Sequence, residues 1–204
     1  GEVAEVAVRS GEDLKDVDQW EEFEHFARSC HIAIFNLHGG KKSLSSFDEL
    51  VQSLQDSSVS IYAQSASNEP EIELMKLSTV DDAVYRKVSQ YLDYGGRKNF
   101  YSLILYLANY FIGSNYEFSE PARPIWEGIY HPDFDHVPTL KEYLQSKCVA
   151  GRPTVGLWFY QSLWQAGNTL FIDRLIEEIE RQGANVIPVF LHAAKDVERG
   201  TKGA

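Results

Sequence analysis

The first third of the chain alternates between two patterns of apolar and polar residues. Residues 3–8 alternate with a period of two, which predicts a strand, and residues 12–28 place apolar side chains at three-residue steps, which predicts a helix. Residues 30–37 form a nearly continuous apolar run, which is typical of a strand covered on both faces. A strand over 59–63 follows a second predicted helix, whose apolar face is formed by Phe47, Leu50, Val51 and Leu54. This order of strands and helices predicts a parallel sheet with right-handed crossovers.

The middle third has a different pattern. It predicts a helix over 81–91, a Tyr-Gly-Gly break at 94–96 and a second helix over 99–112. The second helix is apolar on nearly every side, so we expect it to be buried. Residues 113–138 contain four prolines and no clean period, which predicts an extended connection before a short amphipathic helix over 139–147.

The last third returns to the alternation of strands and helices. Residues 154–160 predict a buried strand, 169–182 a helix, and 185–191 another buried strand. The predicted fold class is therefore α/β, with two Rossmann- or flavodoxin-like subdomains that each hold a parallel sheet.

The change of pattern also predicts the domain organisation. Residues 1–112 form the first α/β subdomain, 113–150 a proline-rich connection with a short helix, and 151–204 the start of a second α/β subdomain. The chain opens inside a predicted strand and closes just after a strand and a turn. We therefore expect a piece of a longer polypeptide, with the second subdomain truncated.

Composition and charge exclude several classes of protein. The chain is 44% hydrophobic and 24% charged, as folded domains are. Its formal net charge of −11 argues against nucleic acid or an anionic membrane as a partner, because binding phosphates needs clustered cations. The longest apolar run, 100–112, is shorter than the roughly 20 residues of a membrane span. Cys30 and Cys148 form neither a disulfide framework nor a zinc motif, so we expect a cytoplasmic protein.

Two short motifs contain residue types that bind ligands. Residues 38–42, His-Gly-Gly-Lys-Lys, follow a predicted strand and are interpreted either as a phosphate loop or as a tight turn, with the turn favoured. Residues 131–136, His-Pro-Asp-Phe-Asp-His, bring together imidazole and carboxylate groups that suit a divalent ion. His131 and His136 are therefore candidate metal ligands, although their spacing matches no closed zinc site and a solvated polar loop is the favoured interpretation.

A third segment is better placed for binding an organic ligand. Residues 160–169 are predicted to form a loop at the carboxyl end of a strand, where open α/β sheets bind ligands. The end of the next strand, at His192, is predicted to lie at the same edge. The candidate binding residues are Tyr160, Gln161, Trp164, Asn168 and His192. The alternative is a connecting loop in which Asn168 caps a helix and Trp164 seals a seam between subdomains.

No catalytic residue is predicted. His25 and His31 lie in apolar patterns and are interpreted as structural. The chain has no Walker motif, no GxGxxG motif and no nucleophile elbow.

Several segments taken in series resemble the CobN/magnesium-chelatase large-subunit family. They are HIAIFNLHGG at 31–40, EIELMKLSTV at 71–80, YLDYGGRKN at 91–99, GIYHP at 128–132, GRPTVGLWFY at 151–160, AGNT at 166–169 and KD at 195–196. Their order and spacing are more specific than any one of them, and together they extend over nearly the whole chain.

The resemblance implies an N-terminal part of the large, tetrapyrrole-binding subunit of an ATP-dependent metal chelatase. Its implied partners are the remainder of the same large subunit and separate AAA+ ATPase subunits, which use ATP and Mg²⁺. The implied reaction is metal insertion of the ligase type, with cobalt and a corrin precursor of cobalamin favoured. The piece alone is expected to bind no cofactor, to hydrolyse no ATP and to insert no metal.

Two departures from the family pattern leave alternatives open. Gln161 stands where the family commonly has Arg, and Ala193-Ala194 stand where it has Ser-Leu. A magnesium- or haem-related chelatase or dechelatase homologue is therefore one alternative. A non-catalytic flavodoxin-like ligand-binding or scaffolding module is another, since it has the same alternation of strands and helices.

Overall fold

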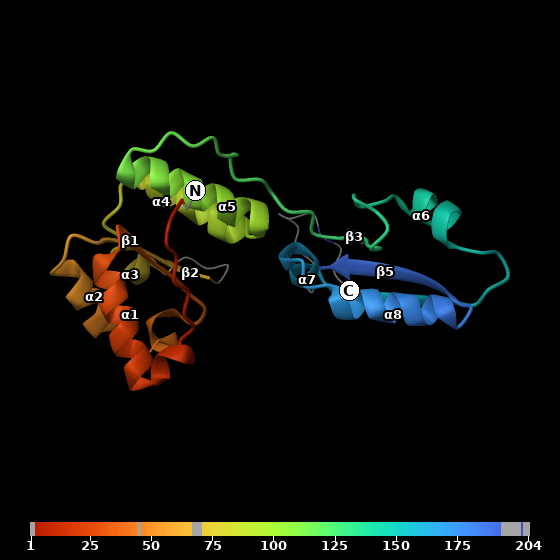
Figure 1. The fold of residues 1–204 in the computed structure, drawn as a ribbon, viewed down its shortest axis with the longest axis horizontal. Helices are drawn as coiled ribbons and strands as arrows, with labels where there is room; N and C mark the ends of the chain where they lie inside the picture. The colour runs from red at the N-terminus through yellow and green to blue at the C-terminus, as the bar shows by residue number, and fades with distance from the viewer. Residues whose placement is uncertain (1–2, 45, 67–70, 193–200, 202–204) are drawn as a thin grey trace. The chain divides into compact units, whose positions relative to one another are not determined.

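The computed structural model describes residues 3–44, 46–66, 71–192 and 201. Its contacts divide the chain into two compact units, Gly1–Ala122 and Arg123–Ala204, and each is described by itself (Figure 1). The division falls inside the segment 113–150, so this segment contributes to both units. Its first part packs on unit 1, where the Asn99 side chain donates to the Ala122 carbonyl at 2.9 Å.

Unit 1 consists of helices around a small parallel sheet. Its described elements are the short 3-10 helices Asp13–Lys15 (η1) and Gly40–Ser43 (η2), the strands β1 (Ile32–Leu37) and β2 (Ser60–Ser65), and the helices α1 (Val17–Ser29), α2 (Phe47–Gln55), α3 (Ile72–Met75), α4 (Asp82–Tyr94) and α5 (Arg97–Ile112). Strands β1 and β2 are parallel, with Ile32 beside Ser60 and Leu37 beside Ser65. The predicted α/β class is confirmed for this unit.

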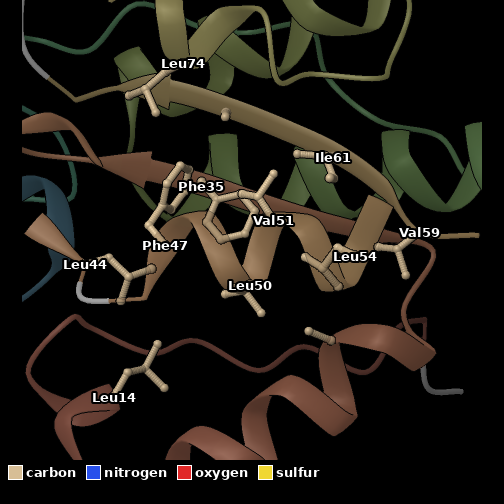
Figure 2. Packing of buried hydrophobic residues seen from close by; sticks show 12 residues of the cluster. Leu14, Phe35, Leu44, Phe47, Leu50, Val51, Leu54, Val59, Ile61 and Leu74 are labelled. Carbon is tan, nitrogen blue, oxygen red and sulfur yellow. The ribbon is translucent and has the colours of Figure 1, made fainter. Parts of the chain in front are cut away.

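The helix α2 covers one face of this sheet. Its predicted apolar face is confirmed, because Phe47, Leu50, Val51 and Leu54 are all buried. Figure 2 shows Phe47 and Val51 on the side of α2 that faces Phe35 of β1, whereas Leu50 points to the opposite side of the helix. The rings of Phe35 and Phe47 meet edge to face, with centroids 5.2 Å apart. The apolar periodicity of α2 thus places four buried side chains in this part of the core of unit 1.

The helices α4 and α5 form a second cluster on Tyr62 of β2. The N-terminus of α4 is capped by Asp81, whose carboxylate accepts the backbone N–H groups of Ala83 and Val84, both at 2.9 Å. The expectation that the apolar helix α5 is buried all round is wrong. Its Tyr101 is 61% exposed, because α4 and the segment that follows α5 cover only part of its surface.

The strand predicted over residues 3–8 is also wrong. Within the described part of the chain these residues form no strand, and Val6 and Val8 are exposed. An alternating pattern produces a strand only where a neighbouring strand accepts its hydrogen bonds, and none lies beside this segment in the described sheets.

Unit 2 has a three-stranded sheet with one long helix packed on it. Its described elements are the strands β3 (Gly128–Ile129), β4 (Thr154–Tyr160) and β5 (Asn185–Leu191) and the helices α6 (Leu140–Lys147), α7 (Gln161–Ala166) and α8 (Leu170–Arg181). The strand order is β3-β5-β4. Strand β4 is parallel to β5, so the predicted α/β class is confirmed here too. Strand β3 is antiparallel to β5, which makes this sheet mixed and not wholly parallel as expected.

The core of unit 2 lies between α8 and the sheet. Ile172 and Ile176 of α8 pack with Phe159 and Phe190 of the two long strands. The prediction that β5 is buried is confirmed for Val186, Pro188 and Phe190. For β4 the same prediction is wrong, since only Phe159 is buried. The reason is its position at the edge of the described sheet, where it pairs with β5 alone among the strands that the structure describes.

No helix of the described residues is both long enough and apolar enough to cross a bilayer.

Candidate functional site

The candidate site lies at the carboxyl edge of the parallel pair β4 and β5. The register places Tyr160, the last residue of β4, beside Leu191, the last residue of β5. His192 follows Leu191 directly. The two segments that the sequence analysis assigned to one edge of a sheet therefore do lie together, as the parallel arrangement requires.

The segment 160–169 is not the open loop that was expected. Residues Gln161–Ala166 form the short helix α7, which ends at Gly167 with φ +71°. This stretch contains no proline or glycine before Gly167, and a glycine in the left-handed conformation is a common helix terminator. A helix directly after a strand fixes the side chains of this edge more firmly than a loop would.

Two of the predicted binding residues are committed to contacts inside unit 2. Gln161 is 4% exposed, and its side-chain amide donates to the Ile125 carbonyl at 3.1 Å and to Gln165 Oε1 at 2.7 Å. The Trp164 indole stacks on Phe190, with ring centroids 4.2 Å apart and planes 5° apart. One face of the indole is thus covered by the core.

The other three predicted residues are more accessible. Tyr160 is 54% exposed and Asn168 is exposed, whereas His192 is half-buried with its ring edge to face on Trp126 at 5.7 Å. Asn168 does not cap α8, because the residue before that helix is Thr169. Asn168 instead lines a shallow hollow with residues of α8: Leu170, Phe171, Arg174 and Leu175. The sequence analysis missed Trp126, although an aromatic residue just before the GIYHP motif is a usable signal.

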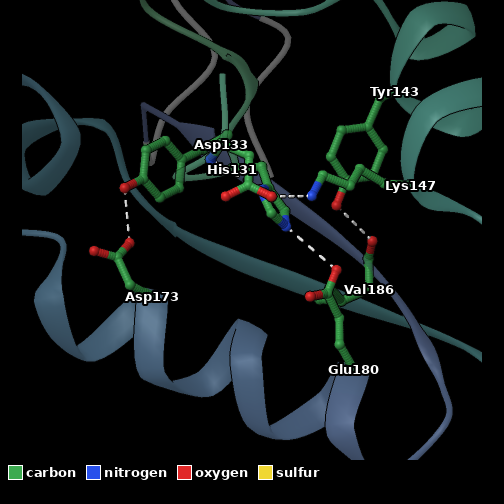
Figure 3. Close-up of polar contacts among 8 residues, drawn as sticks. His131, Asp133, Tyr143, Lys147, Asp173, Glu180 and Val186 are labelled. Carbon is green, nitrogen blue, oxygen red and sulfur yellow. Dashed lines mark hydrogen bonds and ion pairs between the residues drawn. The ribbon is translucent and has the colours of Figure 1, made fainter. Parts of the chain in front are cut away.

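The two candidate metal ligands have separate surroundings. His131 is buried, and its Nδ1 accepts the backbone N–H of Asp133 at 3.1 Å. The proton of the neutral ring is therefore on Nε2, which lies 3.2 Å from Glu180 Oε1 of α8 (Figure 3).

His136 is exposed and lies between the carboxylates of Asp135 and Glu142, at 2.8 and 3.0 Å. The hydrogen bond with Asp135, helped by the one with Glu142, raises the pKa of the His136 imidazole. Within the part of the chain that the structure describes, no group of three His, Cys, Asp or Glu side chains is placed to hold a metal ion. A metal role for His131 and His136 stays a prediction.

The GIYHP motif ties the edge of unit 2 to α8. The Tyr130 hydroxyl lies 2.7 Å from Asp173 Oδ1 and 3.0 Å from Thr169 Oγ1, and burial raises the pKa of this phenol. His131 reaches Glu180, two turns further along the same helix. Gly128 lies so close to the core that a Cβ there would come within 2.9 Å of the Phe190 ring. The motif therefore links β3 to α8 and to β5, and the candidate site lies at the carboxyl end of β5.

An ion pair joins the loop after the GIYHP motif to the end of α6. Lys147 donates to the Asp133 carboxylate, and this hydrogen bond holds the pKa of Asp133 below its usual range (Figure 3). The contribution of Asp133 to stability is therefore fully present above the unfolded-state pKa of about 3.9 and is lost as the pH falls through the lower folded-state value.

We predict that Asp133→Asn lowers the midpoint of thermal unfolding at pH 7, and that its difference from the parent chain shrinks below about pH 4. Thermal melts between pH 7 and pH 3 measure this difference. In a Lys147→Met background, Asp133→Asn should have no such pH-dependent effect. A difference that stays constant down to pH 3 would contradict the ion-pair account.

The glycine loop of unit 1 has the geometry of a turn. Gly39 and Gly40 have φ values of +95° and +69°, and Gly40 is buried against the carboxylate of Glu71. A Cβ at Gly40 would lie 2.5 Å from Glu71 Oε2. Lys41 lies 3.5 Å from Asp48. With a carboxylate packed on the glycine, this loop fits the favoured interpretation as a turn better than a phosphate loop.

The cysteines have no activated setting among the described residues. Cys30 and Cys148 are free thiols. Burial raises the pKa of Cys30, which disfavours the reactive thiolate.

Comparison with known proteins identifies relatives along most of the chain. The chain is 35% identical over 189 residues to an uncharacterised protein of Methanocaldococcus jannaschii, and this alignment includes 91% of the chain. It is 29% identical over 173 residues to the aerobic cobaltochelatase subunit CobN of Pseudomonas aeruginosa, which includes 85% of the chain. The chain spans only 15% and 14% of the lengths of these relatives.

A solved structure has the same fold. The catalytic subunit of cobaltochelatase from Mycobacterium tuberculosis superimposes with a TM-score of 0.63 over 89% of this chain and 14% of its own length, at 19% identity. In addition, the family model for CobN/Magnesium Chelatase matches residues 89–203, which is more than half of the chain. The chain therefore belongs to the CobN/magnesium chelatase family.

Proposed function

We propose that this chain is the N-terminal part of the large subunit of an ATP-dependent metal chelatase that inserts cobalt into a corrin precursor during cobalamin biosynthesis. The observation that carries the proposal is the family match over residues 89–203, together with relatives named as cobaltochelatase subunits. In this proposal the tetrapyrrole is the substrate, and the cobalt ion is also substrate rather than a resident cofactor. The protein acts in the cytoplasm.

The carboxyl edge of β4 and β5 is the part of the chain that we propose contacts the macrocycle. Tyr160 offers an exposed aromatic face, and Asn168 offers an exposed amide nearby in sequence. His192, held against Trp126, presents an imidazole at the same edge. Gln161 and Trp164 act mainly by fixing α7, since both are packed into unit 2. The remainder of the large subunit supplies the rest of the cavity.

The energy source belongs to separate AAA+ ATPase subunits in this proposal. The glycine loop of unit 1 fits this division, because the Glu71 carboxylate packs on Gly40 and would repel a phosphate there. The experiment is reconstitution of the full-length large subunit with its AAA+ partners, ATP, Mg²⁺, cobalt and a metal-free corrin. We expect insertion only when all the proteins are present. Insertion by the large subunit without ATP or partners would contradict the proposal.

We predict that Tyr160→Ala in the full-length protein weakens macrocycle binding by about 2- to 12-fold. This range corresponds to the roughly 0.5–1.5 kcal/mol of an aromatic stacking contact. Absorption titration with the metal-free macrocycle measures the affinity. Tyr101→Ala is the matched control, since that tyrosine is also exposed but lies on α5 of unit 1. Equal affinities of the two variants would show that Tyr160 does not contact the macrocycle.

A further inference from the structure

Strand β4 combines the sequence of a central strand with the position of an edge strand. Residues 154–160, TVGLWFY, are an almost uninterrupted apolar run, which is the pattern of a parallel strand buried on both faces. Among the described strands, however, the order β3-β5-β4 gives it a neighbour on one side only. A strand with the sequence of a central strand at the edge of a sheet is typical of a surface that another segment covers in the complete protein.

Both faces of β4 are only partly covered in unit 2. Val155, Leu157 and Phe159 point to the side of α8, but α8 packs chiefly on β5 and leaves Val155 41% exposed. On the opposite face Trp158 is 60% exposed. These are large apolar surfaces to leave in water in the middle of a strand.

The outer edge of β4 carries unpaired backbone groups. The Asn185 N–H donates to the Pro153 carbonyl at 2.8 Å, which fixes which residues of β4 bond to β5. In a parallel ladder these residues alternate, so Val155, Leu157 and Phe159 bond to β5. The N–H and C=O groups of Gly156 and Trp158 and the N–H of Tyr160 point to the other side, where no strand pairs with β4 in the described sheets.

The helix α8 also leaves apolar surface exposed. Its Ile172 and Ile176 are buried, but the adjoining stripe of Leu170, Phe171 and Leu175 is 68%, 49% and 45% exposed. This stripe borders the shallow hollow that also includes Arg174. A helix with so wide an apolar arc normally has a second partner beside the sheet that it covers.

We infer that β4 pairs at its outer edge with a further parallel strand, and that a helix joined to this strand packs on Leu170, Phe171 and Leu175 of α8. The inference rests on the proposed function in one respect, namely that the chain is part of a large subunit. The occupant is an apolar strand and an amphipathic helix from elsewhere in that subunit. A parallel strand needs a crossover connection, usually a helix, so one β–α unit supplies both elements.

The amount of chain in the relatives supports this occupant. The present chain spans 14–15% of the lengths of the relatives, so a large subunit of their size has ample sequence to supply a strand and a helix. A second copy of the chain fits less well. A two-fold axis perpendicular to the sheet would pair β4 with its copy in the antiparallel direction, whereas a continuous apolar run is typical of a parallel strand.

Hydrogen exchange tests the inference. The backbone amides of Gly156, Trp158 and Tyr160 are compared in the 204-residue chain and in the full-length large subunit, by mass spectrometry with fragmentation to single residues. We expect all three to exchange at least about tenfold more slowly in the full-length protein. The amides of Val155, Leu157 and Phe159 are the internal control, because they are bonded to β5 in both. Unchanged exchange at the three edge amides would overturn the inference.

A substitution gives a second measure. Trp158→Asp should barely change the unfolding midpoint of the 204-residue chain, where the indole is exposed, but should lower that of the full-length protein. Trp158→Phe is the conservative control and should behave as the parent in both. The inference would be overturned if Trp158→Asp had equal effects on the two proteins. It would also be overturned by a concentration-dependent dimer of the 204-residue chain that protects the same amides, or by a reading frame that ends at Ala204. Strand pairing without macrocycle binding would leave this inference standing and would reject the proposed function.

Discussion

Replacing Phe190 with alanine is expected to destabilise unit 2 by about 3–5 kcal/mol, the usual range for a buried phenylalanine. Phe190 is fully buried on β5, where its ring stacks on Trp164 at 4.2 Å and lies 6.4 Å from the ring of Phe159. The substitution therefore leaves a cavity between the sheet and α7, and the packed face of Trp164 loses its partner. Urea unfolding of the 204-residue chain, followed by tryptophan fluorescence, measures the loss.

Phe171→Ala is the matched control for this experiment. Phe171 is on α8 of the same unit but is 49% exposed, so its removal should cost well under half as much. Similar losses for the two variants would show that the core of unit 2 is not centred on Phe190.

The second large effect is expected at the first residue of the GIYHP motif. A Cβ at Gly128 would lie 2.5 Å from Val137 Cγ1 and 2.9 Å from Phe190 Cζ. Gly128→Ala therefore forces β3 away from β5, and overpacking of this kind typically costs about 1–3 kcal/mol. The free energy of unfolding of the 204-residue chain measures the effect.

The control is the glycine of β4, the strand on the other side of β5. A Cβ at Gly156 of β4 would meet no atom within 4 Å, so Gly156→Ala should be neutral or slightly stabilising in the same chain. If Gly128→Ala changed the free energy of unfolding as little as Gly156→Ala, the close approach of β3 to Phe190 would not be the reason for a glycine at position 128.

Most of the secondary structure follows from local pattern. The apolar face of α2 and the cap of α4 at Asp81 are properties of a few neighbouring residues, so the sequence predicts them well. Strand pairing is not local. Residues 3–8 have the alternation of a strand, but no strand of the described sheets pairs with them, and Val6 and Val8 are exposed. The same limit explains β4, whose burial depends on neighbours that its own sequence does not specify.

The candidate site was predictable in place but not in detail. The parallel order of β4 and β5 brings Tyr160 and His192 to one edge, as expected from fold topology. Which of the predicted side chains face solvent depends on the turn that follows β4. Because α7 begins directly at Gln161, the amide of that residue and the ring of Trp164 are directed into unit 2. The buried bond between His131 and Glu180 joins residues 49 apart in the chain, and no spacing rule predicts it.

If this chain is part of a tetrapyrrole-binding chelatase subunit, as we propose, the full-length protein binds a metal-free macrocycle. The full-length protein is titrated with a metal-free corrin and, separately, with a metal-free porphyrin, while the strong near-ultraviolet absorption band of each macrocycle is followed. We expect a saturable shift of that band with one macrocycle per protein and tighter binding of the corrin. A band that does not shift with either macrocycle, for a protein shown to be folded, would contradict it.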